Sequence, residues 1–423
     1  MTRVGGPLVD ISGMSEWEAR QKLRQARHIK LAKGIYIGEG DWSRLDSAAR
    51  ATAQIVASGI ATPATVVAGR SAAILHDLPL VGRQDHHAVE LGGYRATKGG
   101  RRRHDHVYRN LSPAQVGEAK TVTTPYGDVP ATTPAATGLD LARWYELSLG
   151  VRCLDRALAR KATTAADIDT ALKLAHGCSG IQAMRNAARL ASPWSESPRE
   201  SDMKVAMWTA GLPPPLQQVN LYDASGEFVA RLDFFWPDIG FGTEYDGQGK
   251  LAGEFGVPVA VAARQDVERQ HRISNLGVSN FRVDHRSART GAAMRGVAAM
   301  YRRVAARGVP LDPALWKCVG GPAWRPPGFP RGYGRDLFRD LRKRRPPEKS
   351  AWEHRGDTNP HRRAVSVVPI DAATTIATAA SRATDAVCPS TTHPMNAANT
   401  GSSASSTPNT AGGRDRSATS SKE

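Results

Sequence analysis

Two strand-like runs joined by a two-residue turn limit what this chain can fold into. Residues 228–236 and 239–245 are rich in aromatic and aliphatic side chains, and Pro237-Asp238 separates them. This pattern predicts two adjacent antiparallel strands. The other elements predicted around the pair are a helix over 198–210, strands over 216–222 and 278–284, and a helix over 264–276. A helix, three strands, a helix and a final strand predict an α/β (α+β) layer arrangement with a mixed sheet.

Acidic residues stand near the ends of the predicted strand pair. Asp233 and Glu244 occupy the two runs, and Asp246 follows two residues later. Antiparallel pairing would bring Asp233 and Glu244 close together, where each carboxylate raises the pKa of the other unless a cation lies between them. Magnesium prefers oxygen ligands, and a water bound to it can attack a phosphodiester. The pattern therefore predicts a Mg²⁺ site at these three acids. The alternative is that they cap or solvate the ends of a hairpin.

Two more residues are candidates for the same site. Lys250 follows the hairpin in a glycine-bounded loop and could orient or activate the attacking water; otherwise it is a solvated surface lysine. Glu200 opens the helix before the sheet and could support the acids. However, Ser197-Pro198-Arg199-Glu200 is also a capping box with proline at the first helical position, which accounts for Glu200 without chemistry.

The composition indicates the kind of partner. The formal net charge is +17, with 57 Lys+Arg against 40 Asp+Glu, which favours a polyanion such as DNA. The 4 cysteines form no Cys-x-x-Cys pair, so a reducing, cytoplasmic setting is expected. The N-terminus lacks the apolar core of a signal peptide, and the longest apolar run, Val257 to Ala263, is too short to span a bilayer. We therefore expect a soluble protein without a membrane partner.

Basic residues that could contact phosphate occur in three places. Arg101, Arg102 and Arg103 form a cluster, and Arg269 and Arg272 share one face of the helix after the hairpin. Residues 295–345 hold 13 Lys/Arg and 3 acidic residues, a local surplus that would release counterions on binding. The alternatives are a solvated helix face and a charged segment without a dedicated partner.

The rest of the chain divides by pattern. Ser15-Glu-Trp-Glu18 is a capping box that begins a helix, and a basic turn at Lys33-Gly34 separates two β-prone pieces, as in the wing of a winged helix. Helices are predicted over 46–60, 63–76, 134–145 and 151–192, with strand-like runs between 86 and 134. Ala191–Pro198 is rich in serine and proline and predicts a linker.

These features predict five regions. They are a winged-helix-like unit over 1–60, a mixed α/β region over 61–190, a domain over 195–290, a basic extension over 291–345 and a disordered tail over 346–423. The tail is rich in Ala, Ser, Thr and Pro and has too few large apolar side chains to form a core. The composition after about residue 290 also fits a reading frame shifted relative to its relatives.

The region from about Ser195 to His285 resembles the restriction-endonuclease-like nucleases, and more narrowly the branch related to very-short-patch-repair endonucleases that is common in actinobacteria. The matching stretches are Glu196–Ser201, Leu232–Phe234, Gly242–Gly247 and Arg269–Val283. The resemblance covers roughly a fifth of the chain. It implies that Asp233 and Glu244 bind magnesium and that Glu200 supports the site.

One position departs from that family's pattern. The family commonly has a lysine two residues after the second acid, and this chain has Asp246 there. Members of the subfamily often carry Glu-x-Asp-Gly with a basic residue a few positions later, a part that Lys250 would take here. Activity depends on whether Lys250 reaches the metal-bound water.

The N-terminal part resembles the antitoxins of abortive-infection toxin–antitoxin systems, the AbiEi-like proteins. The matching stretches are Leu31–Ile37, Arg70–Leu78 and Thr132–Ala142, spread thinly over about 130 residues. In that family the winged helix binds promoter DNA, and the following domain counters a nucleotidyltransferase toxin. Most matching residues are packing residues, so the resemblance implies architecture more than activity.

Two functions of different class follow from these observations. The first is a DNA-binding protein with a magnesium-dependent endonuclease domain. The second is a non-enzymatic, antitoxin-like transcriptional regulator whose nuclease-like domain has lost its chemistry. A third and weaker alternative is a protein whose basic tail only compacts nucleic acid.

Overall fold

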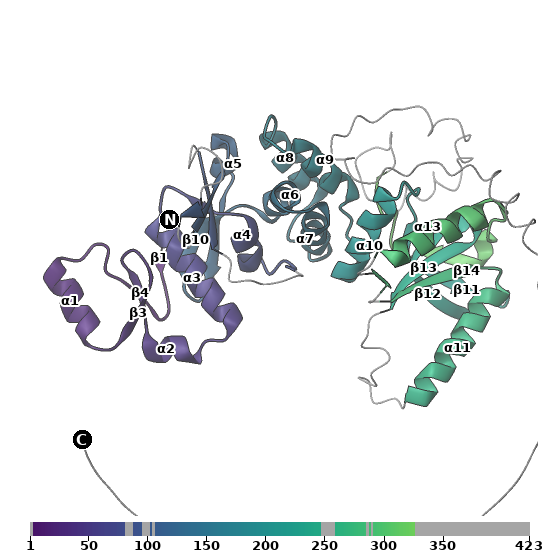
Figure 1. Cartoon of the computed structure of the whole chain (residues 1–423), viewed down its shortest axis with the longest axis horizontal. Coiled ribbons are helices and arrows are strands. Elements are labelled where there is room, and N and C mark those ends of the chain that lie inside the picture. Colours follow the sequence, from purple (N-terminus) through teal and green to yellow (C-terminus); the bar gives the residue numbers. More distant parts are fainter. Residues whose placement is uncertain are drawn as a thin grey trace, which may run out of the picture. The chain divides into compact units, whose positions relative to one another are not determined.

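The protein has a mixed α/β fold, as the sequence predicts, with its strands in three sheets (Figure 1). This description comes from a computed structural model and covers residues 3–80, 88–94, 102–103, 106–246, 259–284, 287–288 and 291–325. The predicted tail over 346–423 lies outside the described residues.

The first sheet is small and antiparallel, with strand order β2-β4-β3. Its elements are β2 (Leu8–Asp10), α1 (Glu16–Arg24), β3 (His28–Ala32), β4 (Ile35–Gly38), α2 (Glu39–Arg44) and α3 (Ser47–Ala61). Ser15 and Glu18 form the predicted capping box of α1. Gly34, with φ of 76°, makes the predicted turn between β3 and β4. Ile35 and Ile37 are fully buried and pack in one cluster with Val56 of α3.

The second sheet has seven strands, in the order β1-β10-β5-β6-β8-β7 with β9 paired to β10. Its elements are β1 (Arg3–Val4), β5 (Val66–Val67), α4 (Gly69–Leu75), β6 (Val89–Gly93), β7 (Arg102–Arg103), β8 (His106–Asn110), α5 (Pro113–Gly117), β9 (Lys120–Thr124) and β10 (Gly127–Ala131). The predicted helix over 63–76 is wrong in its first half. Val66 and Val67 pair with β6 and β10, since β-branched side chains fit a buried pleated surface.

A group of helices follows: α6 (Pro134–Trp144), α7 (Leu147–Ala159), α8 (Ala165–Leu174) and α9 (Ile181–Leu190). The stretch predicted as helical over 151–192 forms three helices, and the cap that Thr164 and Asp167 predict within it does begin α8. Lys161 has a φ of 57°, and Gly177 and Gly180 have φ of 77° and 78°. Left-handed residues of this kind end helices.

The third sheet contains the predicted strand pair. Its elements are α10 (Pro198–Thr209), β11 (Leu216–Tyr222), β12 (Phe228–Trp236), η1 (Pro237–Ile239), β13 (Phe241–Asp246), α11 (Val259–Asn275), β14 (Ser279–Asp284), α13 (Ala292–Ala305), η3 (Pro313–Leu315) and β15 (Trp316–Cys318). The strand order is β14-β13-β12-β11-β15. β12 and β13 pair antiparallel, as predicted, whereas β13 and β14 pair parallel, so the sheet is mixed.

Helices cover both faces of this sheet. Phe234 and Trp236 pack with α10 and α13 on one face, whereas Phe235 packs with Ile273 of α11 on the other. In Figure 1, α13 and α11 lie on opposite sides of the strands. The layers are therefore helix, sheet and helix around two apolar clusters.

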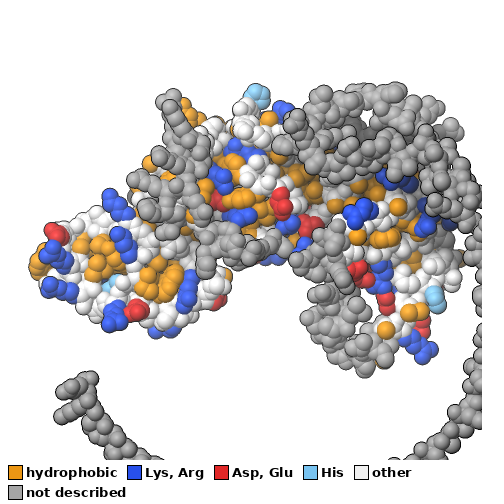
Figure 2. All heavy atoms as spheres, viewed as in Figure 1, with side chains coloured by type: hydrophobic (Ala, Val, Ile, Leu, Met, Phe, Trp, Pro, Cys, Tyr) orange, Lys and Arg blue, Asp and Glu red, His pale blue; other side chains and the backbone are white. Residues whose placement is uncertain are grey.

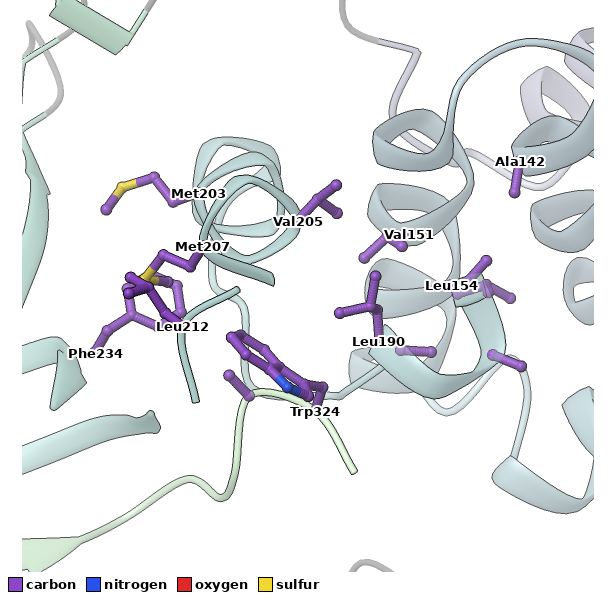
Figure 3. Close-up of a cluster of buried hydrophobic side chains, with 14 of the residues drawn as sticks. Ala142, Val151, Leu154, Leu190, Met203, Val205, Met207, Leu212, Phe234 and Trp324 are labelled. Atoms are coloured by element: carbon purple, nitrogen blue, oxygen red, sulfur yellow. The ribbon is translucent and has the colours of Figure 1, made fainter. Parts of the chain in front are cut away.

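Helix α10 also packs against the preceding helices. Val205 faces Val151 of α7, while Met203 and Met207 point toward Phe234 of the sheet (Figure 3). Ala191 and Ser192, within the predicted linker, are buried. One hydrophobic cluster therefore continues from α6 to the third sheet, and the predicted linker, which forms neither helix nor strand up to Ser197, begins with buried residues.

In the part of the chain that the structure describes, none of the helices combines the length and apolar character needed to cross a bilayer.

Candidate functional site

Asp233 lies where β12 and β13 separate. The ladder between these strands ends at the pair Phe234 and Thr243, and the same register places Asp233 opposite Glu244. One step further on, Asp233 Oδ2 accepts a hydrogen bond of 2.9 Å from the backbone N–H of Tyr245. The side chain of Asp233 thus connects β12 to β13 beyond the last backbone pair of the two strands.

Glu244 is buried, with 6% of its surface exposed, and both carboxylate oxygens have partners. Oε2 accepts from Arg269 Nη2 of α11 at 2.7 Å. Oε1 accepts from Asn280 Nδ2 of β14 at 2.7 Å. A guanidinium and an amide therefore hold the carboxylate in place and compensate its burial.

Asp246 occupies the position where the nuclease pattern has a lysine. Its Oδ1 accepts from Arg282 Nη2 of β14 at 2.6 Å, and Arg282 Nη1 also pairs with Asp266 of α11. In the parallel register between β13 and β14, Arg282 lies beside Glu244. The neighbouring strand thus places a positive charge next to the two acids of β13.

Glu200 lies in the first turn of α10 with only 7% of its surface exposed. Its carboxylate accepts hydrogen bonds from the Glu196 N–H (2.9 Å), the Ser197 hydroxyl (2.8 Å) and Gln218 Nε2 (3.0 Å). Burial, and then the negative charge of Asp233, raise the pKa of Glu200 to about 7. The contacts to 196 and 197 resemble a helix cap, whereas the hydrogen bond from Gln218 connects Glu200 to the sheet.

The predicted site residues therefore divide into two groups. Glu200, Asp233 and Glu244 come from α10, β12 and β13, with Asp233 opposite Glu244 in the register and near enough to Glu200 for its charge to act on that carboxyl. Lys250 lies outside the described residues. Within the described ranges, no three His, Cys, Asp or Glu side chains are grouped closely enough to hold a metal ion.

The arginines predicted to contact phosphate have partners on the protein. Arg269 binds Glu244, and Arg272 Nη2 binds Glu227 at 3.0 Å and lies 3.8 Å from Asp223. Arg102 and Arg103 form β7, and Arg101 lies outside the described residues. Phosphate contact by these residues remains a prediction.

Other residues at the site were not predicted from the sequence. They are Asn280 and Arg282 of β14, Asp266 of α11 and Gln218 of β11. The polar residues of β14 alternate with Phe281 and Val283, a signal that could have identified them once β14 was placed beside β13. The contact made by Gln218 had no such signal.

The donor set agrees chemically with magnesium. The candidate ligands are carboxylate oxygens, and Gln218 adds an amide oxygen, Oε1, that is buried and has no hydrogen-bond partner among the described residues. Hard oxygen donors of this kind suit Mg²⁺. An unpaired buried oxygen on a side chain that binds Glu200 is also the kind of group that a cation or its water would satisfy.

Comparison with known proteins gives limited information. No protein-family model matches the chain. Over 116 residues it is 34% identical to two uncharacterized proteins from two strains of Mycobacterium tuberculosis. The match covers 27% of this chain and 42% of each relative, so the chain spans about two-fifths of the length of these curated relatives. These similarities bring no activity to the chain.

Proposed function

We propose that this is a DNA-binding protein whose third sheet carries a magnesium-dependent endonuclease site for phosphodiester bonds. One observation supports the proposal most: Asp233 lies at the end of the β12–β13 ladder, opposite Glu244. Burial of Glu200, and then the negative charge of Asp233, raise the pKa of Glu200 to about 7. Coupled carboxyls with perturbed pKa values are typical of functional sites.

The side chains have distinct roles in this proposal. Asp233 and Glu244 hold the magnesium ion with Asp246 near them, and Arg269 and Asn280 orient Glu244. Glu200, whose pKa of about 7 lets it exchange a proton at neutral pH, assists at the site. Lys250 is proposed to orient the attacking water. When bound, magnesium would supply a water of lowered pKa.

DNA is proposed as the substrate because of charge. The net charge of +17 favours a polyanion. Arg20, Lys22 and Arg24 are exposed on α1, and Figure 2 shows Lys and Arg side chains spread over the surface that carries this helix. We propose that the small sheet with α1, α2 and α3 is a winged-helix-like unit that contributes to DNA binding.

The test is nicking of supercoiled plasmid by the full chain with magnesium or manganese. We expect wild type to cut and Glu244→Gln to lose most activity. The matched control is Glu268→Gln, which makes the same chemical change at an exposed acid of α11 that pairs with Arg264. Intact plasmid with wild type, or equal cutting by wild type and Glu244→Gln, would refute the proposal.

A second function is favoured by different contacts. Asp246 replaces the lysine of the nuclease pattern and is neutralised by Arg282, while Arg269 and Asn280 occupy both oxygens of Glu244. With these partners, the carboxylates of Asp246 and Glu244 are compensated without a bound cation. The alternative is thus an antitoxin-like regulator, with a nucleotidyltransferase toxin as its partner. Retention of the protein's own promoter fragment without cleavage would favour this alternative.

A further inference from the structure

Gln218 combines three unusual properties in the middle of β11. Its φ is 55°, in the left-handed region that β-strand residues avoid. The other non-glycine residues with positive φ in the described ranges, Asp77 and Lys161, both lie just after helices, where this conformation is common. Gln218, in contrast, lies within a strand. Backbone strain of this kind occurs most often at functional sites.

The distortion coincides with Asp233 on the neighbouring strand. β11 and β12 pair at Gln217 with Phe234 and at Val219 with Leu232, but not at the intervening position, which Gln218 and Asp233 occupy. On its other side, the backbone carbonyl of Gln218 accepts from the N–H of Val319 at 2.9 Å, which continues the register of β11 with β15. The ladder between β11 and β12 is therefore interrupted next to an acid of the proposed site.

The side chain of Gln218 is directed at the same site. It is 4% exposed, and Nε2 donates to Glu200 Oε2 at 3.0 Å. The ionised carboxylate of Glu200 accepts only from the amide nitrogen, and this form of Glu200 sets the orientation of the amide. Oε1 is then left buried without a partner among the described residues, which is costly for a polar atom.

We infer that Gln218 is a positioning residue of the proposed magnesium site. It holds Glu200 through Nε2 and offers Oε1 to the bound cation or its water, which explains both a strained backbone and an unsatisfied oxygen at one position. The inference rests on the proposed function, since it needs a cation at the acids. A purely structural explanation is that Gly320 lies close to the backbone of Gln217, which would account for the left-handed conformation of Gln218. It would not account for the buried Oε1 atom that has no hydrogen-bond partner among the described residues.

The decisive variant is Gln218→Gly, because glycine adopts a positive φ without strain. It relieves the strained backbone but also removes the hydrogen bond to Glu200, so these two effects on thermal stability oppose each other. The affinity for Mn²⁺, measured by calorimetry on the full chain, should fall roughly 10- to 100-fold, the loss typical when a partner of a metal ligand is removed. Lys161→Gly is the matched control: it relieves φ of 57° at an exposed position after α7 and should leave Mn²⁺ affinity unchanged.

The outcomes separate this inference from the proposed function. If wild type and Gln218→Gly bind Mn²⁺ equally, the role of Gln218 is refuted while the magnesium site stands. If wild type binds no Mn²⁺, both are refuted. A loss of binding in Gln218→Gly without loss of stability supports the role, and Gln218→Leu, which retains bulk but no amide, should show the same loss.

Discussion

The raised pKa of Glu200 predicts how stability depends on pH. Its folded-state pKa of about 7, against an ordinary value of 4.5, means that the folded protein binds this proton more tightly than the unfolded chain. The stabilisation from the bound proton is fully present below pH 4.5 and is lost as the pH rises through 7. The shift corresponds to about 3 kcal/mol, and about 2.5 kcal/mol of it falls between pH 5 and pH 8.

Glu200→Gln removes this titration. We expect the free energy of unfolding of the variant, relative to wild type, to increase by about 2.5 kcal/mol on going from pH 5 to pH 8. Any constant cost of fitting an amide among the donors from 196, 197 and 218 cancels in that comparison. So does the titration of buried Asp140, whose pKa is raised to about 6 by burial in both proteins.

The assay is urea unfolding of both proteins at the two pH values. Glu227→Gln is the control, since this acid has 70% of its side chain exposed and should show no such divergence. Parallel stability profiles for wild type and Glu200→Gln would show that Glu200 does not titrate near neutrality, and the argument for its coupling to Asp233 would fail.

Three further predictions concern other buried groups. Lys204 is fully buried and donates to Asp155 at 2.6 Å, so Lys204→Met should destabilise the protein by about 3–5 kcal/mol in urea unfolding. The double variant Lys204→Met/Asp155→Leu should recover part of that loss, and strictly additive effects would contradict the pairing. Burial raises the pKa of Cys153 to about 12, so alkylation at pH 8 should require unfolding; rapid labelling of Cys153 in the native protein would contradict its burial. Arg269→Ala leaves one oxygen of buried Glu244 without its guanidinium, so it should cost about 1–3 kcal/mol and also weaken Mn²⁺ binding, whereas Arg264→Ala on the exposed face should do neither.

The sequence predicted the third sheet well because its signals are local. The bounds predicted for β11 and β12 agree with the structure, and Pro237-Asp238 does lie in the turn between β12 and β13. Proline at the first position of α10 marked its start. In contrast, β15 is three residues long and lies in a proline- and glycine-rich stretch, so only its pairing with β11 makes it a strand.

The candidate site was predictable only in part. The position of Asp233 opposite Glu244 follows from a two-strand register, which a short turn fixes. The partners of Glu244 and Asp246 come from α11 and β14. β14 pairs parallel to β13, and the residue pattern within a strand does not predict which neighbour it pairs with. The left-handed conformation of Gln218 is stabilised by tertiary contacts, and a glutamine carries no signal for it.

The most direct test of the proposed site is the rate at which the full chain nicks supercoiled plasmid in magnesium, compared between wild type and Asp233→Asn. Asparagine retains the shape and an oxygen that can accept from the Tyr245 N–H, but it removes the negative charge. A drop of more than about 100-fold, larger than the usual effect of an outer-shell partner, is the result that we predict. Equal rates for the two proteins would contradict a cation site at the separation of β12 and β13.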